Sequence, residues 1–128
     1  MPTLIYKEEA YQIIGHCMTV HRELGHGFLE AVYKDALEYE FHRNRIPYKR
    51  ECPFTIMYQG VPLPRSYYAD FTVYDRIILE AKALQELSGQ HFSQCINYLK
   101  VSGYNLCLLV NFGVSNFEFK RIVLQSHS

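Results

Sequence analysis

The sequence predicts an α/β protein in which two helices precede three strands, a third helix and two further strands. Apolar residues recur at helical spacing in the first third of the chain and again after residue 90. From Pro53 onward the period changes, and apolar and polar residues alternate as they do in strands. The 128 residues, 48% of them hydrophobic, suffice for one apolar core. We therefore expect a single domain over residues 1–128.

The N-terminal third is predicted to hold two amphipathic helices. Apolar residues repeat at helical spacing over about Tyr6–Leu24. Gly25 is well placed to end this helix, because the residue just past a helix often needs a positive φ. The same spacing predicts a second helix over about Phe28–His42. Within it Glu30 lies at the border of the apolar stripe, so we expect this acid to be partly buried and to need a partner.

Three strands are expected next. FTIMYQG predicts a strand that ends in a turn at its glycine, and VPLPR predicts a proline-rich connector. In YYADFTVYDRIILEAKA the odd-numbered positions of 69–73 and 77–81 are apolar, which indicates a hairpin with one apolar face. A three-residue loop at Tyr74–Arg76 would set Asp70 opposite Glu80, with Cβ atoms about 5 Å apart. A five-residue loop would place the two acids diagonally on the same face.

The C-terminal part is predicted to contain a helix and two strands. Helical spacing returns in QHFSQCINYLKVSG, where Gly103 is placed to end the helix. YNLCLLVNFG is almost wholly apolar, which is typical of a central strand. FEFKRIVL is more polar, and we expect it nearer an edge of the sheet.

Charge and composition argue against several classes of protein. The 13 basic residues balance the 13 acidic ones, so the chain lacks the overall positive charge of many nucleic-acid and membrane binders. No segment reads as a signal peptide or is long enough to span a bilayer. The four cysteines are scattered without a CxxC pair. We expect a soluble cytoplasmic protein without membrane contact, in which local patches carry any nucleic-acid binding.

Two carboxylates on one sheet face are the strongest chemical signal. Asp70 and Glu80 would repel each other unless a cation or a proton lay between them. Their oxygen atoms are the ligands that Mg²⁺ or Mn²⁺ prefers. Lys82 points to the same face as Glu80 and could polarise a water or neutralise charge on a phosphate. By these residues alone, an exposed charge cluster bridged by Lys82 is an equally good interpretation.

Two further groups are candidates for the same function. Gln94 and Tyr98 lie four apart on the third predicted helix, away from its core face, and either reach the sheet or remain solvated. The segment HRNRIPYKR gathers basic side chains after the second helix. They could contact phosphates, or they could favour the C terminus of the helix through its dipole. The basic residues are Arg43, Arg45, Lys49 and Arg50.

Three blocks of the sequence resemble the GxxExxY proteins, a group within the PD-(D/E)xK nuclease-like superfamily. The blocks are IIGHCMTVHRELGHGFLEAVYKDAL, YYADFTVYDRIILEAKA and INYLKVSGYNLCLLVNFG, and together they extend over nearly the whole chain. The residues that match the motifs are Gly27, Glu30 and Tyr33 for the naming motif, Asp70, Glu80 and Lys82 for the superfamily signature, and Gln94 with Tyr98 for the Q-xxx-Y element of RecB-like nucleases.

The resemblance implies a restriction-endonuclease-like α/β fold. Its core would be α-β-β-β-α-β around a mixed central sheet, with an extra N-terminal helix and a C-terminal strand. Asp70 and Glu80 would bind Mg²⁺ or Mn²⁺, helped by Glu30, directly or through water, and by the Ala81 carbonyl. Lys82 would help to activate the attacking water. The implied activity is hydrolysis of phosphodiester bonds in DNA or RNA.

The same fold leaves an alternative function open. A nuclease fold can serve as a binding or regulatory module without turnover, as a homodimer or a partner subunit, because a fold identifies a type of site and not an activity. The zero net charge and the small size of the chain motivate this alternative.

Overall fold

A five-stranded sheet flanked by helices makes up the computed structural model, which describes residues 4–124. The elements, in chain order, are α1 (Lys7–Leu24), α2 (Glu30–Arg43), β1 (Tyr48–Tyr58), β2 (Val61–Val73), β3 (Ile77–Lys82), α3 (Gly89–Ser102), β4 (Leu106–Asn111) and β5 (Glu118–Val123). This order confirms the predicted α/β class and its sequence of elements.

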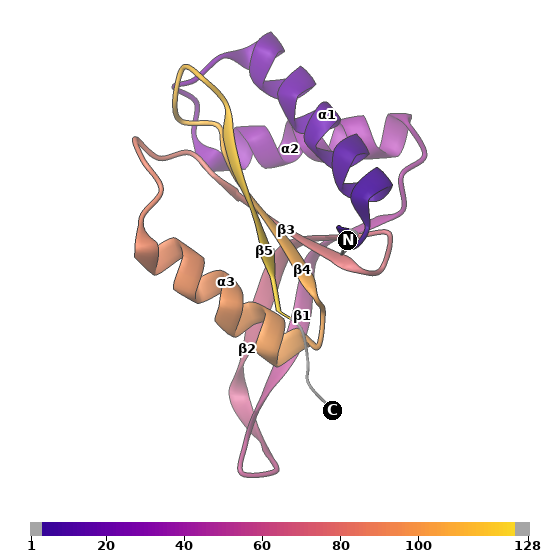
Figure 1. Cartoon of the computed structure of the whole chain (residues 1–128), viewed down its shortest axis with the longest axis vertical. Helices are drawn as coiled ribbons and strands as arrows, with labels where there is room; N and C mark the ends of the chain where they lie inside the picture. The colour runs from indigo at the N-terminus through magenta and orange to yellow at the C-terminus, as the bar shows by residue number, and fades with distance from the viewer. Residues whose placement is uncertain (1–3, 125–128) are drawn as a thin grey trace.

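The strands follow the chain across the sheet in the order β1-β2-β3-β4-β5. All neighbours are antiparallel except β3 and β4, which are parallel and connected through α3. Figure 1 shows α1 and α2 on one side of the sheet and α3 on the other. The mixed sheet is therefore confirmed, with YNLCLLVNFG inside it and FEFKRIVL at its edge, as the hydrophobic patterns predict.

Two apolar clusters hold the helices against the sheet. The larger one, between α1, α2 and the sheet, includes Ile13, Leu37 and Phe71. The smaller one, between α3 and the sheet, includes Ile78 and Leu99. Both faces of the central strands are thus covered, which explains why β4 is buried at every position. None of the helices within residues 4–124 is long and apolar enough to cross a membrane.

The hairpin of β2 and β3 has the predicted short loop, but its apolar face is interrupted. The strands pair over three residues each, in the register that a three-residue loop at Tyr74–Arg76 requires. The prediction of one apolar face is wrong for Ala69, which packs on the α3 side whereas Phe71 packs on the side of α1 and α2. A regular strand would keep both on one face. β2 is irregular at Asp70 between them, next to Glu51 of β1, whose φ is 55°.

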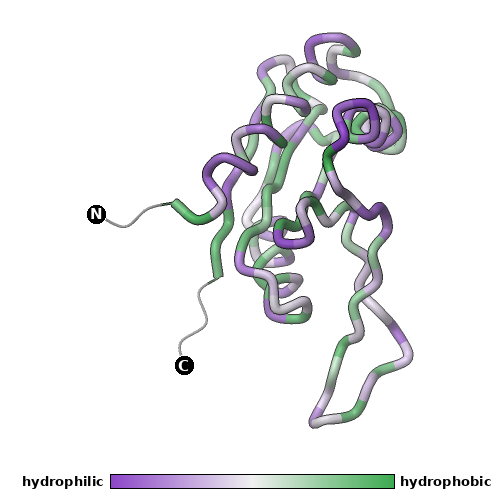
Figure 2. Tube along the Cα trace, turned by 90° about the vertical axis from the view of Figure 1, so that its right-hand side faces the viewer, coloured by the Kyte–Doolittle hydropathy of each residue, from purple (hydrophilic) through white to green (hydrophobic). Residues whose placement is uncertain are grey.

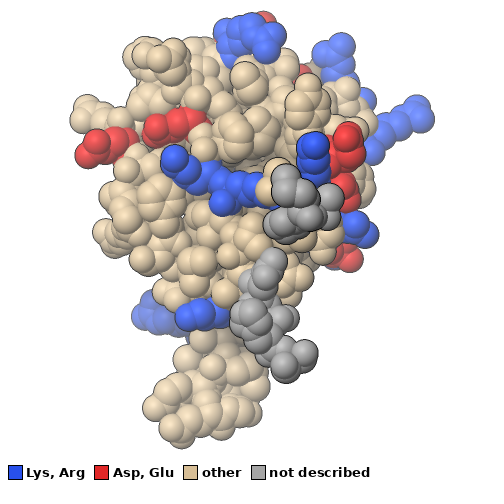
Figure 3. Space-filling view, viewed as in Figure 1, with Lys and Arg blue, Asp and Glu red and all other residues tan. Residues whose placement is uncertain are grey.

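β1 and β2 form a long arm that extends beyond the rest of the molecule (Figure 2). VPLPR begins β2 and is not the predicted connector. Proline is tolerated there, because β3 pairs only with the far end of β2, around Val73, and leaves one edge of β2 open at this point. The segment CPFTIMYQGVPLP has no charged residue, and the end of the arm is accordingly uncharged on the face shown in Figure 3.

The junction of α1 and α2 is held by one tyrosine. Gly25 ends α1 with a φ of 71°, as predicted. The buried hydroxyl of Tyr33 donates to the carbonyl oxygen of Gly25 at 2.7 Å and accepts from the N–H of Phe28 at 3.3 Å. Its ring stacks on Phe112, with 4.7 Å between centroids. These contacts fix the start of α2, and with it the position of Glu30, the first residue of the helix.

Candidate functional site

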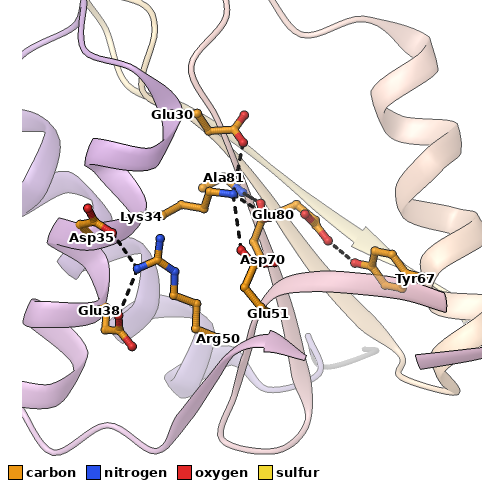
Figure 4. A network of polar contacts seen from close by, with 10 residues as sticks. All are labelled: Glu30, Lys34, Asp35, Glu38, Arg50, Glu51, Tyr67, Asp70, Glu80 and Ala81. Atoms are coloured by element: carbon orange, nitrogen blue, oxygen red, sulfur yellow. Dashed lines mark hydrogen bonds and ion pairs between the residues drawn. The ribbon is translucent and has the colours of Figure 1, made fainter. Parts of the chain in front are cut away.

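The candidate site lies where β2 and β3 separate, facing the N-terminal half of α2 (Figure 4). Asp70 comes from β2 and Glu80 from β3, and their residues are only 9% and 4% exposed. Oδ2 of Asp70 accepts a hydrogen bond from the backbone N–H of Ala81 at 2.9 Å. One oxygen of Asp70 is therefore fixed by the sheet, and the other, Oδ1, is left for a second partner.

That partner is Lys34 of α2, a residue that the sequence analysis missed. Its Nζ lies 3.1 Å from Oδ1 of Asp70, 3.3 Å from Oε2 of Glu30 and 4.0 Å from Oε1 of Glu51. Burial lowers the pKa of Lys34, but the charges of and hydrogen bonds to Asp70 and Glu30 outweigh it, so the pKa is raised overall. Lys34 is therefore charged. The i, i+4 spacing from Glu30 was the sequence signal that could have found it.

Glu80 is buried, and its pKa is raised. Its Oε1 accepts a hydrogen bond from the hydroxyl of Tyr67. Burial, with the neighbouring carboxylate of Asp70 as a further cause, raises the pKa of Glu80 to about 9. The repulsion expected between the two acids is thus relieved by the ammonium group of Lys34 beside Asp70, and the raised pKa of Glu80 favours its neutral form.

Tyr67 connects Glu80 to α3. The ring of Tyr98 stacks on the ring of Tyr67, with 3.8 Å between centroids and 8° between planes. Tyr98 thus supports Glu80 through Tyr67 and does not bond to it directly within residues 4–124. Gln94 is half-buried on the same helix, and no hydrogen bond joins it to either acid in this part of the chain. Strand alternation alone gave no sign of Tyr67, because the irregularity of β2 at Asp70 turns it toward α3.

Lys82, the expected catalytic lysine, is half-buried at the end of β3. Among the described residues it has no carboxylate within 4.0 Å of its ammonium group, so Lys34 is the lysine that bridges the acids. The fully buried Asn111 binds the chain just after Lys82, because its Oδ1 accepts a hydrogen bond from the N–H of Leu84 at 2.9 Å. Within residues 4–124, Lys82 therefore has a fixed backbone and no carboxylate within 4.0 Å, which leaves it available to contact a phosphate.

The predicted basic cluster divides into two parts. Nη1 of Arg50 lies 2.7 Å from Oδ1 of Asp35 and 3.0 Å from Oε1 of Glu38, so this side chain joins β1 to α2. The members that the structure leaves exposed are Arg43, Arg45 and Lys49. Arg43 ends α2, about 20 Å along the helix axis from Glu30. Arg43 and Arg45 thus lie near the opposite end of α2 from Glu30, whereas Lys49 lies on β1 opposite Thr72, two residues along β2 from Asp70.

The donor chemistry of the site fits a hard divalent cation. Asp70 and Glu80 supply carboxyl oxygens, and the backbone of Ala81 faces Asp70. The ammonium group between Asp70 and Glu30 is direct evidence that the site attracts a positive charge. In the conformation described for residues 4–124, however, no three acidic, cysteine or histidine side chains are arranged to hold a metal ion. The ammonium group of Lys34 lies between Asp70 and Glu30.

A family model described as the PD-(D/E)XK nuclease superfamily matches residues 7–122 of the chain. The match includes both acids of the sheet, Lys82, α2 with Glu30 and Lys34, and α3 with Tyr98. The searches of curated proteins and of solved structures gave no match.

Proposed function

The chain belongs to the PD-(D/E)XK nuclease superfamily, and on this basis we propose that it is a metal-dependent nuclease that hydrolyses phosphodiester bonds of DNA or RNA. Members of the superfamily typically use divalent metals. The observation that supports the proposal is the placement of Asp70 and Glu80 at the opening between β2 and β3, with Lys82 at the end of the same strand as Glu80. Within the superfamily, the motif of Gly27, Glu30 and Tyr33 favours the GxxExxY proteins.

Each residue of the site has a role in this proposal. Asp70, Glu80 and the carbonyl of Ala81 hold Mg²⁺ or Mn²⁺, and Glu30 adds a carboxylate from α2, directly or through water. When bound, such an ion supplies a water of lowered pKa and neutralises charge on the phosphate. Lys82 orients the attacking water and stabilises charge on the phosphoryl oxygens.

The aromatic residues and the basic cluster have supporting roles. Tyr67 holds Oε1 of Glu80 in place, and Tyr98 holds Tyr67 by stacking. Gln94 positions the substrate strand from the same helix as Tyr98. The exposed basic side chains near the end of α2 bind phosphates of the nucleic acid outside the reacting position. These are Arg43, Arg45 and Lys49.

Cleavage assays with matched variants test the proposal. The purified protein should cut DNA or RNA with Mg²⁺ or Mn²⁺ and not with EDTA. Asp70→Asn, Glu80→Gln and Lys82→Met should each lower the rate by at least about 100-fold, because each removes a charge or a ligand that acts on the reacting phosphate. Lys120→Met, an exposed lysine on the edge strand β5, is the control and should leave the rate unchanged. Full activity in all three site variants would refute the proposal.

A binding module that keeps the nuclease fold is the second candidate. The observation that favours it is that Lys34 already pairs with Asp70, and burial already raises the pKa of Glu80, without a metal ion. Such a module would bind nucleic acid or a partner equally well with EDTA, and would not cut with any divalent ion. Filter binding with and without EDTA, on the same preparations as the cleavage assay, separates the two functions.

A further inference from the structure

The ammonium group of Lys34 lies beside Asp70, at a position where the proposed nuclease function requires a metal ion. The role inferred here for Lys34 rests on that function. We propose that Lys34 is a resident counter-cation of the acidic site, which a divalent ion must displace from Asp70 in order to bind. Lys34 then determines the metal affinity of the protein, because every binding event includes the loss of its contacts to Asp70 and Glu30.

The oxygen that Lys34 occupies is the one that a metal ion would use. Oδ2 of Asp70 already accepts from the N–H of Ala81 at 2.9 Å and keeps one lone pair, so Oδ1 is the more available oxygen, and Nζ of Lys34 lies 3.1 Å from it. Magnesium binds carboxylate oxygen at about 2.1 Å. An ion on Oδ1 would therefore lie within about 5 Å of the ammonium group whatever its direction, and two positive charges at that distance repel strongly in a partly buried site.

Displacement needs only the side chain of Lys34 to move. The start of α2 is anchored by the hydrogen bonds and stacking of Tyr33, so the helix itself can stay in place. A lysine has a flexible stem of four carbons. Glu51 offers the ammonium group a partner farther out, since its side chain is 56% exposed and already lies 4.0 Å from Nζ. The ammonium group can therefore leave Asp70 and still keep a carboxylate beside it.

Removal of the charge on Lys34 should tighten metal binding. Each hydrogen bond to a charged group corresponds to about a tenfold factor in an equilibrium constant. Lys34 makes contacts of this kind to Asp70 and Glu30, so Lys34→Met should bind Mn²⁺ about 10-fold to 100-fold more tightly than the wild type. Lys34→Arg keeps the positive charge and should not bind it more tightly. A lysine with only a structural role predicts the same or weaker Mn²⁺ binding after either substitution.

Calorimetric titration of the metal-free, full-length protein with Mn²⁺ is the test. The proteins are the wild type, Lys34→Met, Lys34→Arg and the control Lys120→Met, which removes an exposed lysine from β5. We expect Lys34→Met to bind Mn²⁺ more tightly than the wild type, and Lys120→Met to bind it as tightly as the wild type. A second measurement, the rise in melting temperature on addition of Mn²⁺, should be largest for Lys34→Met, because its acids have no other cation.

The outcomes separate this inference from the proposed function. Equal Mn²⁺ affinity of the wild type and Lys34→Met would overturn the role of Lys34 and leave the nuclease proposal standing. The absence of binding in every variant would overturn both. Tighter binding in Lys34→Arg as well as in Lys34→Met would show that charge is not the cause, and would also overturn the inference. If Lys34→Met does not fold, Lys34→Gln replaces it, since an amide can still donate to Asp70 without a charge.

Discussion

Replacement of Glu80 by glutamine should remove a large pH dependence from the stability of the metal-free protein. Burial, together with the carboxylate of Asp70, raises the pKa of Glu80 from 4.5 to about 9. The folded protein therefore binds this proton more tightly than the unfolded chain does. The resulting stabilisation is fully present below the unfolded pKa of 4.5, and it is lost as the pH rises through the folded pKa of about 9.

The size of the effect follows from the pH window. Between the two pKa values, each pH unit lowers the free energy of unfolding by about 1.4 kcal/mol. From about pH 5 to about pH 8 the wild type should thus lose about 4 kcal/mol through this one group. For a chain of 128 residues, 1 kcal/mol corresponds to about 3 °C to 5 °C in melting temperature, so the shift is about 12 °C to 20 °C.

Thermal unfolding in EDTA, followed by circular dichroism at several pH values, measures this difference. Glu80→Gln cannot ionise, and its amide can accept the hydrogen bond from Tyr67 and donate to Asp70. All other titrating groups are common to the two proteins, so the difference between their slopes reports Glu80 alone. Parallel pH profiles for the two proteins would refute the reasoning, because they would mean that Glu80 is ionised in the folded state at neutral pH.

The remaining predictions concern Gly113 and Tyr33, and the free energy of unfolding in urea is the measurement for both. Gly113→Ala should lower the free energy of unfolding by about 1 to 3 kcal/mol, because the new Cβ would lie 2.4 Å from the backbone N of Leu84. The control Gly15→Ala lies in open space on α1 and should raise the free energy of unfolding by about 0.5 to 1 kcal/mol. Equal effects of the two would contradict the crowding at Leu84. Tyr33→Phe should lower the free energy of unfolding by about 1 to 3 kcal/mol, because the carbonyl oxygen of Gly25 loses its hydroxyl donor. An unchanged free energy of unfolding would mean that water replaces the hydroxyl.

The course of the chain could largely be predicted from the sequence, because it depends on local physical chemistry. Helical periods, alternation and one continuous apolar run predicted the order of the helices and strands that the structure describes over residues 4–124. Gly25 and Gly103 were identified as helix ends because a positive φ excludes most side chains, and both have it. The parity of the apolar positions on the two strands left a three-residue and a five-residue loop open, and the observed register is that of the three-residue loop Tyr74–Arg76.

The start of β2 shows where local sequence patterns fail to predict a strand. VPLPR contains two prolines and was predicted as a connector, yet it begins β2. Whether proline is tolerated depends on which edge of the strand lacks a neighbour, and β3 does not reach that end of β2. A neighbour strand is a property of the whole sheet, and the local composition of the segment contains no information about it.

The sequence by itself predicted the acids of the proposed site, since strand parity puts Asp70 and Glu80 on one face and the resemblance to the GxxExxY proteins adds Glu30. Only the tertiary structure decided how those acids are balanced. Lys34 lies 36 positions before Asp70 in the chain and meets it because α2 packs over the opening between β2 and β3. The raised pKa of Glu80 depends on its burial and on the nearby carboxylate of Asp70, which outweigh the hydrogen bond from Tyr67 that lowers it. Electrostatic balance depends on distances and burial in space, and a one-dimensional pattern contains neither.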